Sequence, residues 1–318
     1  MFATNDLENS RLALQEAAGQ GCDMASLVVH MSDVYANRED MDADAQEGWA
    51  RYDALIEAAA RHFPWLCFRL HLNYTAKGII RNALEKGKTP VFSFAEMMQD
   101  QWGNRECLQM HEGAACFALP AVRERLVEFV RRFARRYAHL ADRINWLSVT
   151  LSNTQETEYP HGNRDFVDRA NDEAFWKYFD RWPTAQALLR QTERFWPGEQ
   201  GEWPTRLDYH PAHAPAFRGY LMFTYRTLAA LNAAWDTRYT DWEQVRPPRI
   251  ANPDIRTSCF EDWRLLFRTR PGIDWYRFAA ANLKAFLLDC RAAFREVRAD
   301  LPLCTEFGSC TDPLGILR

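Results

Sequence analysis

The sequence predicts a parallel α/β protein of barrel type with one long helical insertion, and three observations support this class. Short apolar runs alternate with amphipathic segments of helical period. The run "INWLSVTLS", residues 144–152, is apolar nearly throughout, as is typical of a strand covered on both faces. Residues 161–270 contain helical segments and proline-rich polar loops but no convincing strand. We therefore expect one domain over residues 1–318, with a helical insertion over 161–270.

The N-terminal elements follow from local patterns. A helix is expected first, ending near Gly19 and Gly21, because glycine commonly follows the last helical residue. "MASLVVHM" and "WLCFRLHL" are expected to be strands, and "WARYDALIEAAARHF" between them has helical spacing of its apolar residues. "TPVFSFAEM", residues 89–97, is expected to form either a short strand or an active-site loop.

"PAVRERLVEFVRRFARRYAHL", residues 120–140, is the clearest helix of the sequence. Pro120 suits its first turn, and apolar residues recur at helical spacing to form one stripe. On an acidic chain its four clustered arginines indicate a solvated helix face rather than a nucleic-acid patch. The stripe consists of Val122, Leu126, Val130, Phe133 and Tyr137, and the arginines are Arg131, Arg132, Arg135 and Arg136.

Three C-terminal segments complete the pattern. "AFRGYLMFTYRTLAALNAAW", residues 216–235, is expected to be a helix within the insertion. "WYRFAAANLKAFLLDCRAAFREV", residues 275–297, predicts a long helix. "LPLCTEFGS", residues 301–309, then predicts a strand and turn.

Composition excludes several functional classes. The net charge of −4 gives no basic footprint for nucleic acid or for an anionic membrane surface. No apolar stretch approaches the ~20 residues that a membrane span requires, and no signal-peptide pattern opens the chain. The eight cysteines lack CxxC pairs, so reduced thiols in a cytoplasmic protein are expected. The aromatic content of 14% favours large core side chains over ring stacking, and a homo-oligomer is left open.

Polar residues gather just past each expected strand. In an α/β barrel these positions share one face, and that face holds the active site. We therefore expect an active-site face lined from several strand ends. The residues are His30, Ser32 and Asp33 after the first strand, His71, Asn73 and Tyr74 after the second, Glu96 after the third, Asn153, Gln155, Glu156 and Glu158 after the next, and Glu306 after the last.

The chemistry that these residues indicate is glycoside hydrolysis by paired carboxylates. Glu156 is the candidate acid/base, and Gln155 beside it could hold a sugar 2-hydroxyl. Glu158 is either a binding residue or a solvated loop carboxylate. Trp102 and Tyr159 are expected to stack against sugar rings in the same cleft.

Two segments resemble known glycosidases. "LADRINWLSVTLSNTQETEYP" resembles the fourth-strand segment of clan A glycoside hydrolases, whose strand ends in an Asn-Glu pair with the Glu as acid/base. "YRTLAALNAAWDTRYTDWEQVRPP" resembles a segment of the family 42 β-galactosidases, which implies a (β/α)8 barrel and a carbohydrate substrate. The fit is most specific at residues expected to pack rather than to catalyse, namely Leu231, Asn232, Trp235, Thr237, Tyr239, Trp242, Pro247 and Pro248.

The chain departs from the family pattern in three respects. The Asn-Glu pair is Gln155-Glu156 here. The family's nucleophile follows the seventh strand, whereas "LPLCTEFGS" aligns with the fifth, so a partial barrel is expected and Glu306 is either a substitute nucleophile or a binding or structural carboxylate. Some members hold zinc in a cysteine cluster, but only Cys107 and Cys116 lie near the corresponding place. The pair His210 and His213 has an unremarkable spacing, and no metal or cofactor is expected.

Three functions remain open from the sequence. The first is a retaining glycoside hydrolase of β-galactosidase type. The second is a carbohydrate-binding barrel that lacks a complete catalytic pair. The third is an unrelated α/β enzyme that uses His30, Asp33 and His71 with a metal ion.

Overall fold

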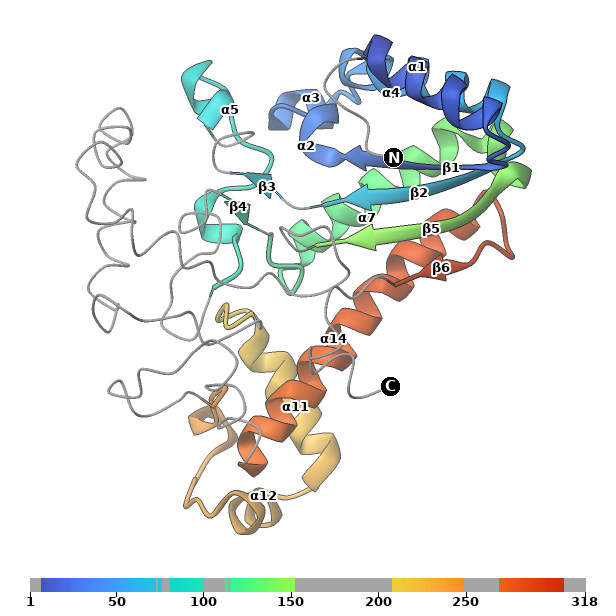
Figure 1. Cartoon of the computed structure of the whole chain (residues 1–318). Helices are drawn as coiled ribbons and strands as arrows, with labels where there is room; N and C mark the ends of the chain where they lie inside the picture. Colours follow the sequence, from blue (N-terminus) through green and yellow to red (C-terminus); the bar gives the residue numbers. More distant parts are fainter. Residues whose placement is uncertain are drawn as a thin grey trace, which may run out of the picture. The chain divides into compact units, whose positions relative to one another are not determined.

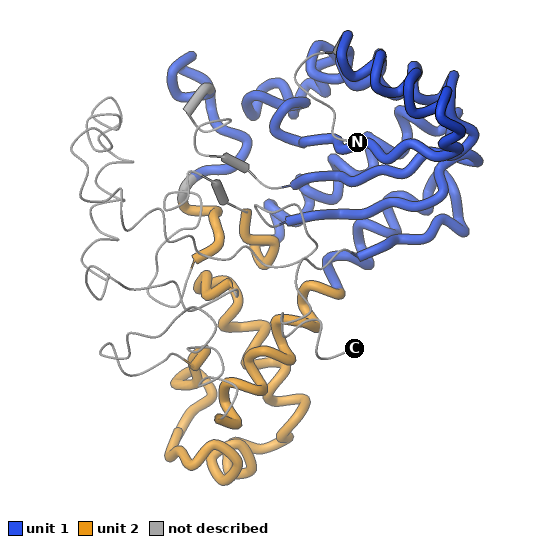
Figure 2. Tube along the Cα trace, in the orientation of Figure 1, with its two compact units in different colours: residues 1–93, 120–158, 285–318 blue, residues 94–119, 159–284 orange. Residues whose placement is uncertain are grey.

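A computed structural model gives the fold, and the chain divides into two compact units (Figure 2). The first contains residues 1–93, 120–158 and 285–318, and the second contains 94–119 and 159–284. No helix in the described part is long and apolar enough to cross a membrane. The structure describes residues 7–72, 74–75, 81–99, 112–113, 115–151, 208–248 and 269–305.

The first unit is built on a parallel sheet with the strand order β1-β2-β5-β6 (Figure 1). Spatial order therefore follows chain order, which is the arrangement of a barrel rather than of a doubly wound sheet, whose order reverses at a switch point. The strands are β1 (Met24–His30), β2 (Trp65–His71), β5 (Ile144–Thr150) and β6 (Leu303–Cys304).

The helices of the first unit confirm the expected alternation. Helix α4 lies against β1 and β2, and α1 packs on α4. At Gly48 of α4 an added Cβ would lie 1.8 Å from the carbonyl oxygen of Val34, so only glycine allows this close approach. The elements are α1 (Leu7–Gly19), α2 (Met31–Val34), α3 (Arg38–Asp42), α4 (Gln46–His62), β3 (Tyr74–Thr75), α5 (Arg81–Glu85), α7 (Pro120–Arg136) and η3 (Ala138–Arg143).

Helix α7 buries the predicted stripe and pairs its arginines. The ring centroid of Phe133 lies 5.0 Å from those of both Phe68 and Tyr137, and all three side chains are buried. On the other face, Arg136 forms an ion pair with Asp53, and Arg131 forms ion pairs with Glu128 and Glu296. The arginine cluster is therefore matched by carboxylates within the unit.

The second unit contains short elements and part of one long helix. Helix α14 (Arg270–Arg295) contributes residues to both units. The sequence predicted one helix over 216–235, and this was wrong: Arg226 has φ 66° and ends α11, and the Thr227 hydroxyl then caps α12 by accepting from the Ala230 N–H. The remaining elements are η2 (Phe94–Glu96), β4 (Glu112–Gly113), α11 (His213–Tyr225), α12 (Leu228–Trp235) and η4 (Trp242–Gln244).

Segment 89–97 adopts the loop alternative rather than a strand. It contains a 3-10 turn at Phe94–Glu96 and an isolated antiparallel bridge at Met97. Of the strand predicted in 301–309, the structure describes residues 301–305, and among these Leu303 and Cys304 form β6.

Candidate active site at the carboxyl edge of the sheet

Three polar side chains lie in register at the carboxyl ends of neighbouring strands. His30 ends β1 and pairs with His71 at the end of β2, which in turn pairs with Thr150 at the end of β5. The arrowheads of these strands point to the same edge (Figure 1). Because all strands are parallel, the sequence rule that polar residues past each strand meet at one edge holds for this part of the fold.

His71 is the best-defined side chain of this row. Its Nδ1 lies 2.9 Å from Thr150 Oγ1, and its ring centroid lies 4.7 Å from that of His30 in an edge-on contact. Burial lowers the pKa of His71 to about 3, and the nearby His30 and Arg69 act in the same direction. The imidazole is therefore neutral near pH 7, and it can donate one hydrogen bond and accept one.

Asp33 and Tyr52 form a second polar pair beside His30. The Tyr52 hydroxyl accepts from the His30 backbone N–H at 3.1 Å and donates to Asp33 Oδ2 at 2.9 Å. Burial and the Asp33 carboxylate raise the pKa of Tyr52, so its hydroxyl stays protonated and continues to donate. Asp33 itself is exposed, which leaves its carboxyl group accessible to a ligand.

Comparisons with known proteins find a similarity in the C-terminal part of the chain. Residues 198–314 match the family model described as beta-galactosidase, glycoside hydrolase family 42. The segment 225–248, whose sequence resembles the family 42 β-galactosidases, lies within this matched range.

Residues 198–314 are similar to the family 42 glycoside hydrolases.

Curated relatives match part of the chain. Beta-galactosidase bgaB of Geobacillus kaustophilus is 32% identical over 106 residues, which are 32% of this chain and 14% of that protein. BgaB of Geobacillus sp. (strain Y412MC61) is 31% identical over 106 residues. The match thus spans about one seventh of the length of these relatives.

Solved structures of glycosidase barrels confirm the fold class over most of the chain. The catalytic domain of beta-amylase from Paenibacillus polymyxa has a TM-score of 0.59 at 16% identity, covering 95% of this chain and 63% of that chain. Beta-galactosidase from Bacillus circulans sp. alkalophilus has a TM-score of 0.53 at 14% identity. This match covers 95% of this chain and 34% of that chain. A partial (β/α)8 barrel agrees with both likenesses and with the sequential parallel sheet.

Several predicted site residues lie outside the described residues. Of the others, His71 and Asp33 lie at the carboxyl edge, whereas Glu96 is half-buried and belongs to the second unit. Those outside are Glu156, Glu306, Asn153, Gln155, Glu158, Tyr159, Asn73 and Trp102, together with Cys107.

The metal alternative at His30, Asp33 and His71 lacks support in the described part of the chain. There, three ligand atoms lie within 4.8 Å of one another only at Cys116, Asp208 and His213. Asp33 is instead bonded to Tyr52, and His71 to Thr150.

The sequence did not predict that Thr150 and Tyr52 belong to the candidate site. Thr150 is the last residue of β5, so strict use of the strand-end rule would have found it. Tyr52 lies on the apolar face of α4, where a tyrosine is indistinguishable from a core residue until its hydroxyl is seen to donate to Asp33.

The lowered pKa of His71 predicts a pH-dependent stability. An unfolded histidine has a pKa of about 6.5, so below that pH the unfolded chain binds a proton that folded His71 refuses down to about pH 3. The contribution of His71 to the free energy of unfolding is therefore fully present above about pH 6.5 and is lost as the pH falls, by about 2–3 kcal/mol between pH 7 and pH 4.5. Urea unfolding at several pH values measures the free energy of unfolding and how it depends on pH.

The control variant is His71→Asn, because an asparagine amide can occupy the place of Nδ1 beside Thr150 while having no charge to titrate. Its free energy of unfolding should depend less steeply on pH than that of the unaltered chain. Parallel pH profiles for the two proteins would contradict the assignment to His71.

Proposed function

We propose that this chain is a retaining glycoside hydrolase of β-galactosidase type that cleaves terminal β-linked sugars. The observation that carries the proposal is the kinship with family 42, in a chain whose parallel sheet presents His30, His71 and Thr150 at its carboxyl edge. Barrel enzymes bind their substrates at that edge. Glu156 follows β5 closely in the sequence, and Glu306 follows β6.

The proposed mechanism uses two carboxyl groups in turn. Glu156 protonates the glycosidic oxygen while a carboxylate attacks the anomeric carbon, and Glu306 is the candidate for that nucleophile. Water then attacks the glycosyl–enzyme ester, with Glu156 accepting its proton. Retention requires the two carboxyl groups to lie about 5–5.5 Å apart.

The other candidate residues would bind and orient the sugar. His71, neutral near pH 7, can donate to one hydroxyl or accept from it, and the exposed Asp33 carboxyl can accept from another. Asn73, Asn153, Gln155 and Glu158 are proposed to add hydrogen bonds, and Trp102 and Tyr159 to stack on the sugar ring. The chemistry requires no cofactor.

A second candidate function is sugar binding without hydrolysis. It is favoured by one observation: in family 42 the nucleophile follows the seventh barrel strand, whereas the described sheet has four strands. A chain with Glu156 but no correctly placed nucleophile would hold a sugar at the carboxyl edge and leave its glycosidic bond intact.

The deciding experiment combines an assay with a binding measurement on the full chain. Aryl β-galactosides serve as substrates, with the matching β-glucosides and α-galactosides as controls for the axial hydroxyl and the anomeric configuration. Proton NMR of the first product identifies its anomer. Turnover of the β-galactoside with β-galactose formed first supports the hydrolase.

The other outcomes separate the two candidates. Calorimetric binding of galactose or lactose without turnover supports the binding protein and overturns the hydrolase. α-Galactose as the first product contradicts retention. If the chain shows no turnover and no binding of galactose or lactose, both candidate functions are contradicted.

A further inference from the structure

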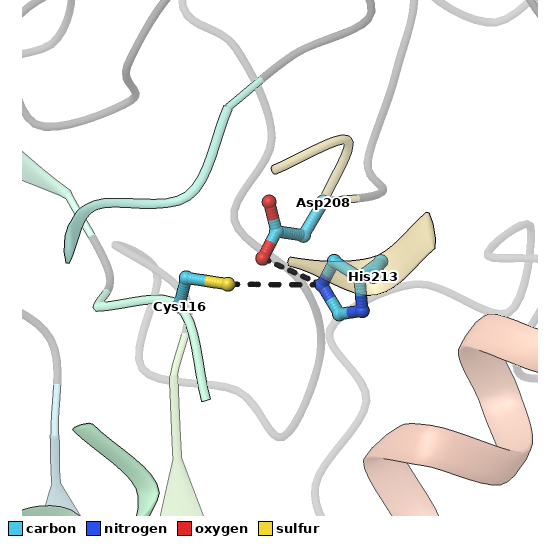
Figure 3. Close-up of side chains that lie close together, drawn as sticks. All are labelled: Cys116, Asp208 and His213. Atoms are coloured by element: carbon cyan, nitrogen blue, oxygen red, sulfur yellow. Dashed lines mark hydrogen bonds and ion pairs between the residues drawn. The ribbon is translucent and has the colours of Figure 1, made fainter. Parts of the chain in front are cut away.

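A buried cluster of three metal-ligating side chains lies in the second unit, outside the proposed active site (Figure 3). Cys116 Sγ lies 3.8 Å from His213 Nε2, and the same nitrogen lies 2.8 Å from Asp208 Oδ2. All three residues are at most 3% exposed. Cys116 comes from the segment before α7, Asp208 from the segment before α11, and His213 is the first residue of α11.

The geometry distinguishes this cluster from a nucleophilic relay. In a cysteine–histidine–aspartate relay, the thiol and the carboxylate bond to opposite nitrogens of the imidazole. Here Sγ and Oδ2 both approach Nε2, as Figure 3 shows. The imidazole N–H can serve only one of these partners, and the Cys116 thiol can donate to the Asp208 carboxylate, whereas one cation placed among the three atoms would contact all of them.

The surrounding groups fix the orientation of the potential ligands. Asp208 Oδ1 accepts from the backbone N–H groups of Gln99 at 3.0 Å and His210 at 2.8 Å, which leaves Oδ2 directed at the cluster. The Asn282 amide nitrogen lies 3.4 Å from His213 Nδ1. With the amide rotated by about 180°, its oxygen would accept the Nδ1–H and leave Nε2 free as a ligand.

We infer that Cys116, Asp208 and His213 bind a zinc ion. Zinc accepts mixed sulfur, nitrogen and oxygen ligands at about 2.3, 2.0–2.1 and 2.0–2.2 Å, which place tetrahedral ligand atoms about 3.3–3.6 Å apart. The observed separations of 3.8 and 2.8 Å bracket that range. One thiolate and one carboxylate balance the two positive charges, so the buried centre is neutral.

The ligand set differs from the cysteine cluster of the family. It contains one cysteine and completes the centre with an aspartate and a histidine from a distant part of the sequence. The sequence led us to expect no metal, because no cysteine cluster follows the fourth strand and because His210 and His213 have an unremarkable spacing. Water is sufficient as the fourth ligand.

An aromatic shell surrounds the imidazole of His213 in the cluster. The ring centroids of Trp275, Phe278 and Phe117 lie 6.1, 6.0 and 6.4 Å from that of His213. A zinc ion there would join the segments that carry Cys116 and Asp208 to α11.

The test uses the full chain and does not depend on activity. Mass spectrometric metal analysis of the purified protein should find about one zinc per chain. Replacing zinc by Co²⁺ should produce a thiolate-to-cobalt charge-transfer band with tetrahedral d–d bands. A chain that contains no zinc, takes up none when it is added, and shows no such cobalt spectrum overturns the inference without any variant.

Two variants and a matched control locate the ion. Cys116→Ser and His213→Gln should each weaken zinc binding by at least about 100-fold in a chelator competition. Cys290→Ser is the control, since Cys290 is a fully buried cysteine outside the cluster and its variant should keep its zinc. Zinc retained in Cys116→Ser, or lost equally in Cys290→Ser, overturns the assignment.

Discussion

Replacing Glu156 by glutamine is expected to lower kcat on an unactivated β-galactoside by about 10²–10⁴-fold, the usual contribution of a general acid. Glutamine keeps the shape of the side chain and removes its proton. The loss should shrink for dinitrophenyl β-galactoside, because its leaving group departs without protonation. Steady-state kinetics on both substrates measures the difference.

Glu158 provides the matched control for Glu156, because it is a glutamate two positions further along the same segment. If Glu158 binds the sugar, Glu158→Gln should raise KM and change kcat by no more than a few fold. The rise in KM should not depend on the leaving group. Equal losses on both substrates in Glu156→Gln would contradict the acid/base role of Glu156.

Glu306→Gln tests the nucleophile separately. Turnover abolished by both Glu156→Gln and Glu306→Gln assigns the carboxylate pair to these residues. Turnover lost only in Glu156→Gln would place the nucleophile elsewhere in the chain. Either result leaves the zinc inference untouched, because the zinc measurements do not use activity.

The parallel sheet could be predicted because each main element can be recognised from its own stretch of sequence. Apolar runs such as 144–152 and the helical stripe of 120–140 specify their own elements, and the alternation of strands and helices then specifies parallel pairing. The same logic placed His71 and Asp33 at the carboxyl edge, since strand ends of a parallel sheet share one side.

The features that the sequence did not predict have either a local cause that the apolar pattern concealed or a cause in contacts between distant segments. The break between α11 and α12 follows from the cap at Thr227, which the continuous apolar pattern of 216–235 concealed. Cys116 meets Asp208 and His213 only in the fold, and no spacing rule connects residues so far apart. Tyr52 likewise resembled a core residue.

The family-specific segment 225–248 has a structural role, as its residue types predicted. Asn232 accepts at Oδ1 from the Tyr239 N–H and the Thr237 hydroxyl, both at 2.9 Å, and donates to the Tyr239 carbonyl at 2.8 Å. Trp235 is buried and donates from Nε1 to Asp274 Oδ2 at 2.9 Å. The recognisable motif therefore stabilises a loop and anchors α12 to α14 within the second unit.

Asp274→Ala is expected to destabilise the chain by about 2–4 kcal/mol. Asp274 is fully buried, and its Oδ2 accepts from the Tyr225 hydroxyl at 2.5 Å, from Trp235 Nε1 at 2.9 Å and from Arg270 Nε at 3.3 Å. Removing the acceptor leaves the buried Trp235 N–H without a partner, at a cost of about 1–3 kcal/mol, and also removes the charged bond with Arg270. Urea denaturation of the second unit, followed by tryptophan fluorescence, measures the change.

The control for Asp274→Ala lies on the same helix. Asp289 forms an ion pair with Arg123 at 2.6 Å, but half of its side chain is exposed, so Asp289→Ala should cost less than about 1 kcal/mol. A double-mutant cycle of Asp274→Ala with Trp235→Phe should show a coupling of about 1 kcal/mol, since the phenylalanine has no N–H to lose. If the two aspartate variants were equally stable, or if the cycle were additive, Asp274 could not be the acceptor that fixes the family 42 motif to α14.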